Sequence, residues 1–136
     1  MRREIAWIRG VTRAVAETGG AGFGGTAGPL SEAEDALEQA THDMQRYLES
    51  DPQSALAGAS QYLRLFGLTL GGACLAKAGL AAEALAAEGD ESELGRVSLA
   101  RFYAKKLLPV APGIARAIAS GAAPLEAHEA ILTESA

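Results

Sequence analysis

The stretch that decides the fold is QYLRLFGLTLGGACLAKAGLAAEAL, residues 61–85. The eighteen residues from Leu65 to Ala82 contain one charged side chain, Lys77, and the smallest residues gather in the middle of the run. Such a stretch could be a membrane span, a dimerisation helix or the central helix of a bundle. The apolar run ends at Ala76, well short of the roughly 20 residues that a transmembrane helix needs. We therefore predict no membrane span, and a central bundle helix.

Composition supports a single helical domain. Hydrophobic residues make up 49% of the 136-residue chain but aromatic residues only 5%, so the interior has to be built from alanine, leucine and glycine. Small side chains suit closely packed helices better than a β-sheet. Acidic residues outnumber basic ones by 17 to 12, which argues against a nucleic-acid partner. Cys74 is the only cysteine, so we expect no disulfide within the chain, and a buried, inert thiol in a reducing cytoplasm.

The fold class that we predict is all-α: an antiparallel four-helix bundle, up-down-up-down, with a long central third helix. The first helix runs from Arg2 to about Glu17. A mobile, glycine-rich loop is expected over residues 18–30, because so many glycines oppose any regular element. The second helix is predicted to begin at Ser31, whose hydroxyl can form a capping box with Glu34.

The boundaries of the third helix carry the clearest local signals. Asp51-Pro52 should begin it, because aspartate is a good N-cap and proline fits the first helical position. Gly89 should end it. The fourth helix is expected from about Glu91 to Ser120, with a kink or short break at its two prolines. The remaining residues, 122–136, form a packed or frayed tail of this one domain.

Each helix has an apolar stripe that predicts its buried face. The predicted core positions are Ile5, Ile8, Thr12 and Val15 in the first helix; Ala33, Leu37, Ala40, Met44 and Tyr47 in the second; Leu56, Ala59, Leu63, Phe66, Leu70, Ala73, Leu80 and Ala84 in the third, with Lys77 interrupting; and Val97, Ala100, Ala104, Leu107, Ala111, Ile114 and Ile118 in the fourth. A second apolar stripe runs along the third helix through Tyr62, Leu65, Gly72 and Leu75, so we expect this helix to contact neighbours on more than one side.

Two motif matches have simpler explanations than ligand binding. Residues 20–25 fit the pattern GxGxxG, but dinucleotide binding needs that pattern between a strand and a helix, and here a helix precedes it. Glu38 and His42 lie four residues apart, a spacing that could supply two metal ligands, yet Arg46 would repel a cation. We expect a flexible linker, a solvated helix face, no metal site and no catalytic residue.

Aromatic residues on the third and fourth helices are the best candidates for packing or interaction. Tyr62, Phe66 and Phe102 could line a ligand pocket between these helices, although core packing would use the same side chains. Residues 101–106 include a small basic patch, either solvated or facing a partner. The possible packing or interface residues are Tyr62, Phe66, Gly71, Gly72, Phe102 and Tyr103.

Two segments resemble a known family. ALAGASQYLRLFGLTLGGACLAKAG, residues 55–79, and ARFYAKKLLPVAPGIARAIASGAAPL, residues 100–125, are similar to the C-terminal extension of large bacterial acyl-CoA dehydrogenases. The methylmercaptopropionyl-CoA dehydrogenases and related long enzymes carry this extension. The matching elements are YLRLFG at 62–67 with the glycine pair at 71–72, RFY at 101–103, LLP at 107–109, and Ile118 to Gly121.

The resemblance implies a role without chemistry of its own. The parent enzymes use FAD to oxidise an acyl-CoA thioester between Cα and Cβ, and a glutamate removes the α proton. The flavin-binding region and that glutamate belong to preceding catalytic domains, so no catalytic or cofactor-binding residue is assigned to this chain. We expect a fragment of a longer enzyme, or a detached subunit, whose partners are those catalytic domains, in a homo-oligomer. The alternative is a stand-alone helical adaptor or acyl-ligand-binding bundle.

Overall fold

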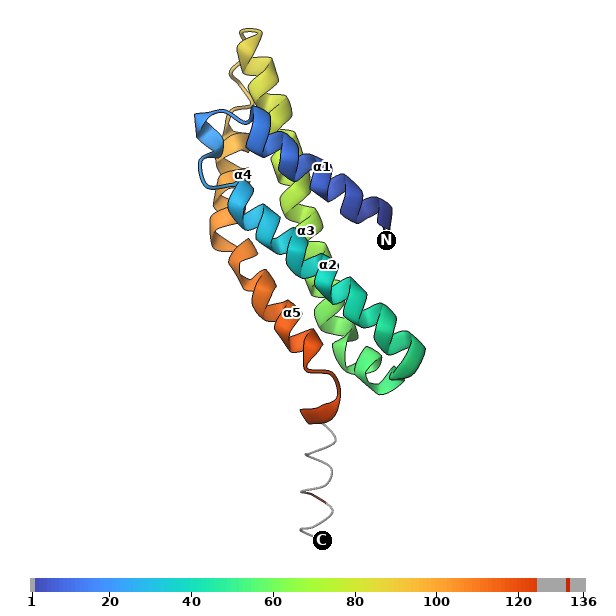
Figure 1. Ribbon diagram of the computed structural model, residues 1–136. Coiled ribbons are helices and arrows are strands. Elements are labelled where there is room, and N and C mark those ends of the chain that lie inside the picture. Colours follow the sequence, from blue (N-terminus) through green and yellow to red (C-terminus); the bar gives the residue numbers. More distant parts are fainter. Residues whose placement is uncertain (1, 125–131, 133–136) are drawn as a thin grey trace.

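The computed structural model describes residues 2–124 and residue 132, and every regular element among them is helical (Figure 1). This confirms the all-helical prediction. The expected fourth helix is divided by a 3-10 segment, and most of the predicted tail lies outside the described residues. The elements are α1 (Arg2–Thr18), η1 (Ala21–Phe23), α2 (Ala27–Ser50), α3 (Pro52–Ala87), α4 (Gly95–Lys106), η2 (Leu108–Val110) and α5 (Ala111–Ala119).

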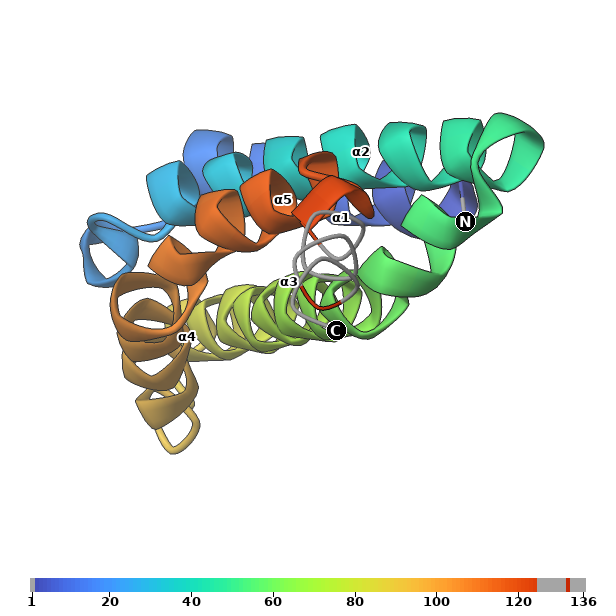
Figure 2. The same ribbon diagram turned by 90° about the horizontal axis from the view of Figure 1, so that it is seen from below.

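The long helix α3 is the element on which the others assemble. It contacts α1, α2, α4 and α5. In Figure 1, α2 descends and α3 climbs back beside it, while α4 and α5 descend again. Seen from below in Figure 2, α3 lies along the lower edge of the bundle, and α1 and α2 lie above it. α5 packs against both α2 and α3 and so fills the space between these two helices.

The predicted boundaries of α3 are confirmed. The Asp51 carboxylate accepts a hydrogen bond from the Ser54 backbone N–H (3.3 Å), and Pro52 occupies the first helical position. Gly89, two residues beyond the end of α3, has a φ of +107°, the left-handed conformation that glycine adopts without steric cost. Gly121 follows α5 in the same way, with a φ of +63°.

The predicted start of the second helix is wrong. α2 begins at Ala27, four residues before Ser31, and Ser31 lies exposed within it. Pro29 falls in the first turn, where it is tolerated because the first backbone N–H groups of a helix have no partner within the helix. The carboxylate of Glu34 pairs with Arg9. The capping box between Ser31 and Glu34 therefore does not mark a helix start.

The glycine-rich loop is shorter and better anchored than expected. Phe23 in η1 is only 4% exposed, and its ring lies where a Cβ on Gly79 would come within 2.8 Å. The Gly20 N–H donates to both carboxylate oxygens of Glu83, at 2.9 and 3.0 Å. A buried aromatic and a bond to α3 anchor the segment, and α2 already begins at Ala27, so the predicted extent of the loop, residues 18–30, is wrong.

The predicted buried faces of α1 and α2 are confirmed. All four core positions of α1 are buried, and Met44 is the one α2 position that is only partly buried. Trp7 lies at the edge of the α1 stripe and is 36% exposed. These helices have a polar face opposite the apolar one, so their orientation is determined by the sequence pattern.

The main predicted stripe of α3 is wrong over its first half, where Ala59 is exposed together with two leucines, whereas the second stripe is buried at Leu65 and Gly72. Leu56 and Leu63 are 73% and 74% exposed, whereas Leu65 and Thr69 are completely buried. The buried side of α3 otherwise consists mainly of small residues, such as Gly72. Helices approach most closely where side chains are small, so the bundle forms on the small side and leaves leucines outside.

The buried face of the fourth helix is confirmed at every predicted position except Leu107. The 3-10 segment η2 shifts the register there, because a 3-10 helix has about 3.0 residues per turn and an α-helix has about 3.6. Leu107 is 42% exposed and Leu108 only 1% exposed. The predicted break at the prolines is confirmed. Because of it, Leu108 occupies the core position that was predicted for Leu107.

α3 is the one helix among the described residues that is long and apolar enough to cross a membrane, judged by length and composition alone. In its apolar 18-residue window, 39% of the residues are buried inside the bundle. Much of the helix is therefore open on the side turned away from its neighbours.

Candidate interaction surfaces

Tyr103 seats α4 on the small residues of α3. Its hydroxyl donates to the backbone carbonyl of Leu68 at 2.7 Å. A Cβ added to Gly71 would lie 2.9 Å from the Tyr103 hydroxyl, and one on Gly72 would lie 3.1 Å from Leu108. The glycine pair is thus the space into which Tyr103 and Leu108 fit. Partial burial raises the pKa of the Tyr103 phenol above its ordinary value of 10.0.

Tyr62 and Phe66 form a second aromatic contact, on the side of α3 that meets α2. Their ring centroids are 6.3 Å apart in an edge-to-face arrangement. The hydroxyls of Tyr62 and Thr41 are hydrogen-bonded at 2.8 Å. Burial raises the pKa of Tyr62, and the hydrogen bond to Thr41 offsets part of that rise. Both rings pack partly buried against the core, a position that supports helix packing.

Phe102 lies apart from this pair and is 58% exposed, so it does not share a buried pocket with Tyr62 and Phe66. Leu99, Phe102 and Lys106 recur at three- and four-residue spacing on one face of α4, and Leu107 follows directly after the helix. All four are exposed. We call these four residues the α4 surface. It combines large apolar side chains with a cation.

The outer side of α3 carries a second apolar surface. Leu56, Leu63 and Leu70 follow each other at intervals of seven residues, and Leu70 is half-buried while the other two are exposed. A parallel column of small residues has the same spacing: Ser60, Gly67, Cys74 and Ala81, all exposed. We call the two columns the outer row. Cys74 is exposed, so the prediction of a buried thiol is wrong.

A groove of about 490 Å³ between α1 and α3 adjoins the outer row. α1 contributes Trp7, Gly10, Val11 and Ala14 to its lining, and α3 contributes Lys77, Leu80 and Ala81. The Lys77 ammonium lies 5.6 Å from the centre of the Trp7 ring, a cation–π contact that turns the charge toward α1. The groove is apolar, and it is open to solvent along α3.

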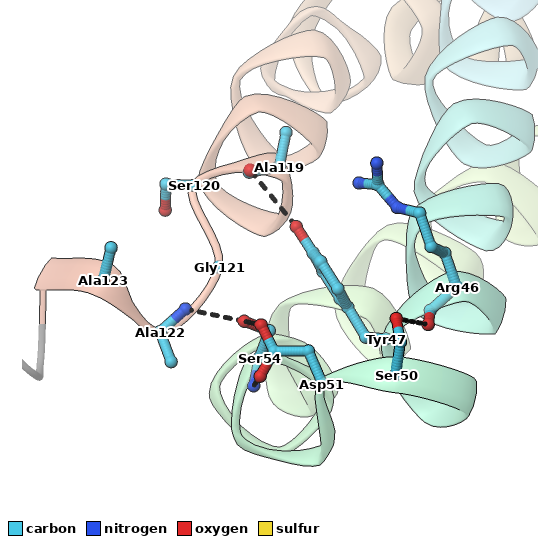
Figure 3. A pocket seen from close by; sticks show the side chains of 10 residues that line it. All are labelled: Arg46, Tyr47, Ser50, Asp51, Ser54, Ala119, Ser120, Gly121, Ala122 and Ala123. Atoms are coloured by element: carbon cyan, nitrogen blue, oxygen red, sulfur yellow. Dashed lines mark hydrogen bonds between the residues drawn. The ribbon is translucent and has the colours of Figure 1, made fainter.

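A polar pocket of about 430 Å³ lies at the other end of the bundle, where the α2–α3 turn meets the end of α5 (Figure 3). The Tyr47 hydroxyl donates to the carbonyls of Ile118 (3.0 Å) and Ala119 (3.2 Å). Ser54 donates to the Asp51 carboxylate (2.6 Å) and its oxygen accepts from the Ala122 N–H (3.0 Å). These polar groups are hydrogen-bonded to one another, and their bonds fasten the end of α5 to the α2–α3 turn.

The candidate ligand residues on α2 are engaged in an ion-pair clamp. The Arg9 guanidinium donates to the buried carboxylate of Glu34 and to that of Glu38, both at 2.7 Å. The bond to Glu34, followed by that to Glu38, raises the pKa of Arg9 further above its usual range. Glu38 is thus paired with a cation from α1, and His42 is exposed. Within residues 2–124 and at 132, no three acidic, histidine or cysteine side chains form a metal-binding group.

The structure does not gather the six predicted interface residues into one site. Gly71, Gly72 and Tyr103 meet between α3 and α4, Tyr62 and Phe66 face α2, and Phe102 belongs to the α4 surface. The sequence prediction missed the outer row, because its leucines were assigned to the core. The seven-residue spacing of both columns was the signal that could have identified it.

Comparison with known families identifies the domain. Residues 6–128 match the family described as acetyl-CoA dehydrogenase C-terminal like, which covers nearly the whole chain. No curated protein and no solved structure matches the chain. The matched range includes both segments on which the resemblance to acyl-CoA dehydrogenases rests, residues 55–79 and 100–125. The chain belongs to the acyl-CoA dehydrogenase C-terminal domain family.

Proposed function

We propose that this chain is a noncatalytic domain that packs on the catalytic body of an FAD-dependent acyl-CoA dehydrogenase and supports its assembly or the shape of its substrate site. The observation that carries the proposal is the family match over residues 6–128. A C-terminal domain has a catalytic body before it in the enzymes that contain both. Within the family, YLRLFG at 62–67 and RFY at 101–103 favour the methylmercaptopropionyl-CoA dehydrogenase type.

The α4 surface is our candidate for the contact with that body. Phe102 and Leu99 are 58% and 50% exposed, far more than aromatic and leucine side chains in a packed core. Aromatic residues at the centre of an interface contribute strongly to binding, and Lys106 supplies a charge at the rim. The antiparallel, up-down-up-down order that we infer makes α4 and α5 together the fourth rod, with α4 on the outside.

The test uses a flavin-containing dehydrogenase body that lacks its own C-terminal extension. The chain should coelute with this body and alter the kcat or KM for acyl-CoA. Phe102→Ser should weaken the affinity for the body at least tenfold, so that coelution is lost. Leu48→Ser is the matched control, because Leu48 is 71% exposed on α2 and lies outside the α4 surface. If both variants bind as well as the unchanged chain, the α4 surface is the wrong contact.

Two measurements on the chain alone test the noncatalytic role. The purified chain should be colourless and should not reduce a dye in the presence of acyl-CoA. Titration with a fatty acyl compound should leave Trp7 fluorescence unchanged, although Trp7 lines the apolar groove beside α3. A yellow preparation with dehydrogenase activity contradicts the proposal. A saturable fluorescence change would support the alternative, an acyl-ligand-binding bundle.

A further inference from the structure

The outer row has the repeat of a helix-pairing seam. Both of its columns advance by seven residues, the spacing at which two helices stay in contact along their length. Leu63, at the centre of the leucine column, is 74% exposed, and a Cβ added to Gly67 would meet nothing within 4 Å. In Figure 2, α3 lies below α1 and α2, and its lower side is turned away from both helices. None of the described residues covers this side.

The division into a large and a small column determines how a second helix of the same kind can pack. In a parallel pair, leucines of the two helices would face each other at one level, and small residues would face each other at the next. The distance between the helices would then have to differ from level to level. In an antiparallel pair, every leucine faces a small residue of the other helix. All layers then have similar volume, and the helices keep one close separation, as dense packing requires.

One register satisfies this rule along the whole row. With a two-fold axis between Leu68 and Thr69, the leucine column of each copy falls opposite the small column of the other. The layers are then Leu56 with Ala81, Leu63 with Cys74, Leu70 with Gly67, and Lys77 with Ser60. A surface that pairs with itself across a two-fold axis has to be self-complementary in this way.

We propose that the outer row is a self-association surface, on which a second copy of this chain packs antiparallel across that two-fold axis. The proposal does not depend on the α4 surface or on the dehydrogenase body. Charge does not oppose it strongly. Residues 52–82 contain no acidic side chain, and their two cations are Arg64 and Lys77. Lys77 is turned toward Trp7.

The contact area indicates a weak dimer. Over residues 56–81 the row is about 39 Å long at 1.5 Å per residue. A contact of this length and one helix width covers roughly 400 Å² of each copy, or roughly 800 Å² in total, which is below the area of about 1,200–2,000 Å² that stable interfaces bury and fits only a weak, transient pair. We therefore expect a dissociation constant in the micromolar range, strengthened by salt because the flanking charges are alike.

Sedimentation equilibrium of the full chain tests self-association. The mass should rise from the 13.9 kDa monomer toward twice that value as the protein concentration increases into the hundreds of micromolar. Leu63→Glu should weaken association at least tenfold, because it places a charge opposite Cys74. Leu48→Glu introduces the same charge at a leucine of similar exposure (71%) on α2 and should associate like the unchanged chain. Circular dichroism should show that both variants remain helical.

A disulfide reports the register. Leu63→Cys should form an oxidised dimer through Cys74 of the second copy, and Leu48→Cys should not do so at the same rate. Residues 63 and 74 are about 16 Å apart along one helix, so this disulfide cannot form within a chain. A chain that stays monomeric at the highest concentration overturns the proposal, as does equal weakening by the two glutamate variants or equal cross-linking by the two cysteine variants. Protection of Cys74 from thiol reagents only when a dehydrogenase body is added would assign the row to that body instead.

Discussion

Leu63 and Leu65 are two residues apart on α3 and lie in opposite environments, one 74% exposed and the other completely buried. They have the same side chain and nearly the same neighbours in sequence. Their difference comes from helix geometry, which separates positions i and i+2 by about 200°. The exposures of these two leucines therefore show which side of α3 faces the core of the bundle.

Leu65→Ala should lower the free energy of unfolding by about 2–5 kcal/mol, because it removes buried methyl groups and leaves a cavity. Leu63→Ala should change it by less than about 0.5 kcal/mol at low protein concentration, where the chain is monomeric. Urea unfolding followed by circular dichroism gives both values. If Leu63→Ala proved the costlier change, the orientation of α3 would be reversed.

Gly79→Ala should destabilise the domain by about 1 kcal/mol. Alanine is favoured over glycine in a helix by about 1 kcal/mol, but here its Cβ would lie 2.8 Å from the buried Phe23 ring and 3.4 Å from the Val97 Cα. Gly10→Ala is the matched control in α1, where a Cβ meets nothing within 4 Å, and it should stabilise by about 0.5–1 kcal/mol. Thermal unfolding of the two variants should shift in opposite directions.

Asp51→Ala should cost about 1 kcal/mol, the usual loss when an N-cap is removed. The same carboxylate also holds Ser54, whose oxygen accepts the Ala122 N–H, so the end of α5 should loosen too. Asp51→Asn keeps an oxygen able to cap the helix and should lose much less. Chemical denaturation measures the stability, and faster amide exchange at Ala122 in the alanine variant would report the loosened contact.

The stability of the domain should fall above about pH 10 in a way that depends on Tyr103. Its folded pKa is raised above the ordinary value of 10.0 by burial, so the unfolded chain releases the proton first as pH rises. The contribution of this group is complete below pH 10.0 and is lost as pH climbs toward the raised value. Tyr103→Phe should cost about 0.5–1.5 kcal/mol at neutral pH through the lost bond to Leu68, and should then decline less steeply.

Urea unfolding at several alkaline pH values tests this dependence. Burial also raises the pKa of Tyr62, although its bond to Thr41 lowers it in part, so Tyr62→Phe should show an effect in the same direction. Equal slopes for the unchanged chain and for both variants would show that neither phenol contributes.

The sequence predicts the helices of this domain well where their faces differ in polarity. The stripes through Ile8 in α1 and Leu37 in α2 are buried as expected, because charged residues occupy the opposite sides of these helices. The Asp51-Pro52 boundary is also predictable, since an N-cap and a first-position proline act locally. Such signals depend on a few neighbouring residues.

The orientation of α3 was not predictable from periodicity alone, because this helix is apolar on nearly every side. The leucine column fits a helix-pairing seam as well as the small residues do, yet the bundle uses Gly71 and Gly72 to bring Tyr103 and Leu108 close. Likewise, nothing in the glycine-rich loop marks Phe23 as a core residue, because the space for its ring is provided by Gly79, which is distant in sequence. Both errors come from treating small residues as passive rather than as sites of close approach.

The contacts of α3 with every other α-helix also determine how the domain comes apart. α1, α2, α4 and α5 all contact this one helix, so a break within α3 would disturb the packing of each of them. We therefore expect local opening mainly at the chain ends and turns, and the slowest amide exchange in the centre of α3, where opening should require unfolding of the whole domain.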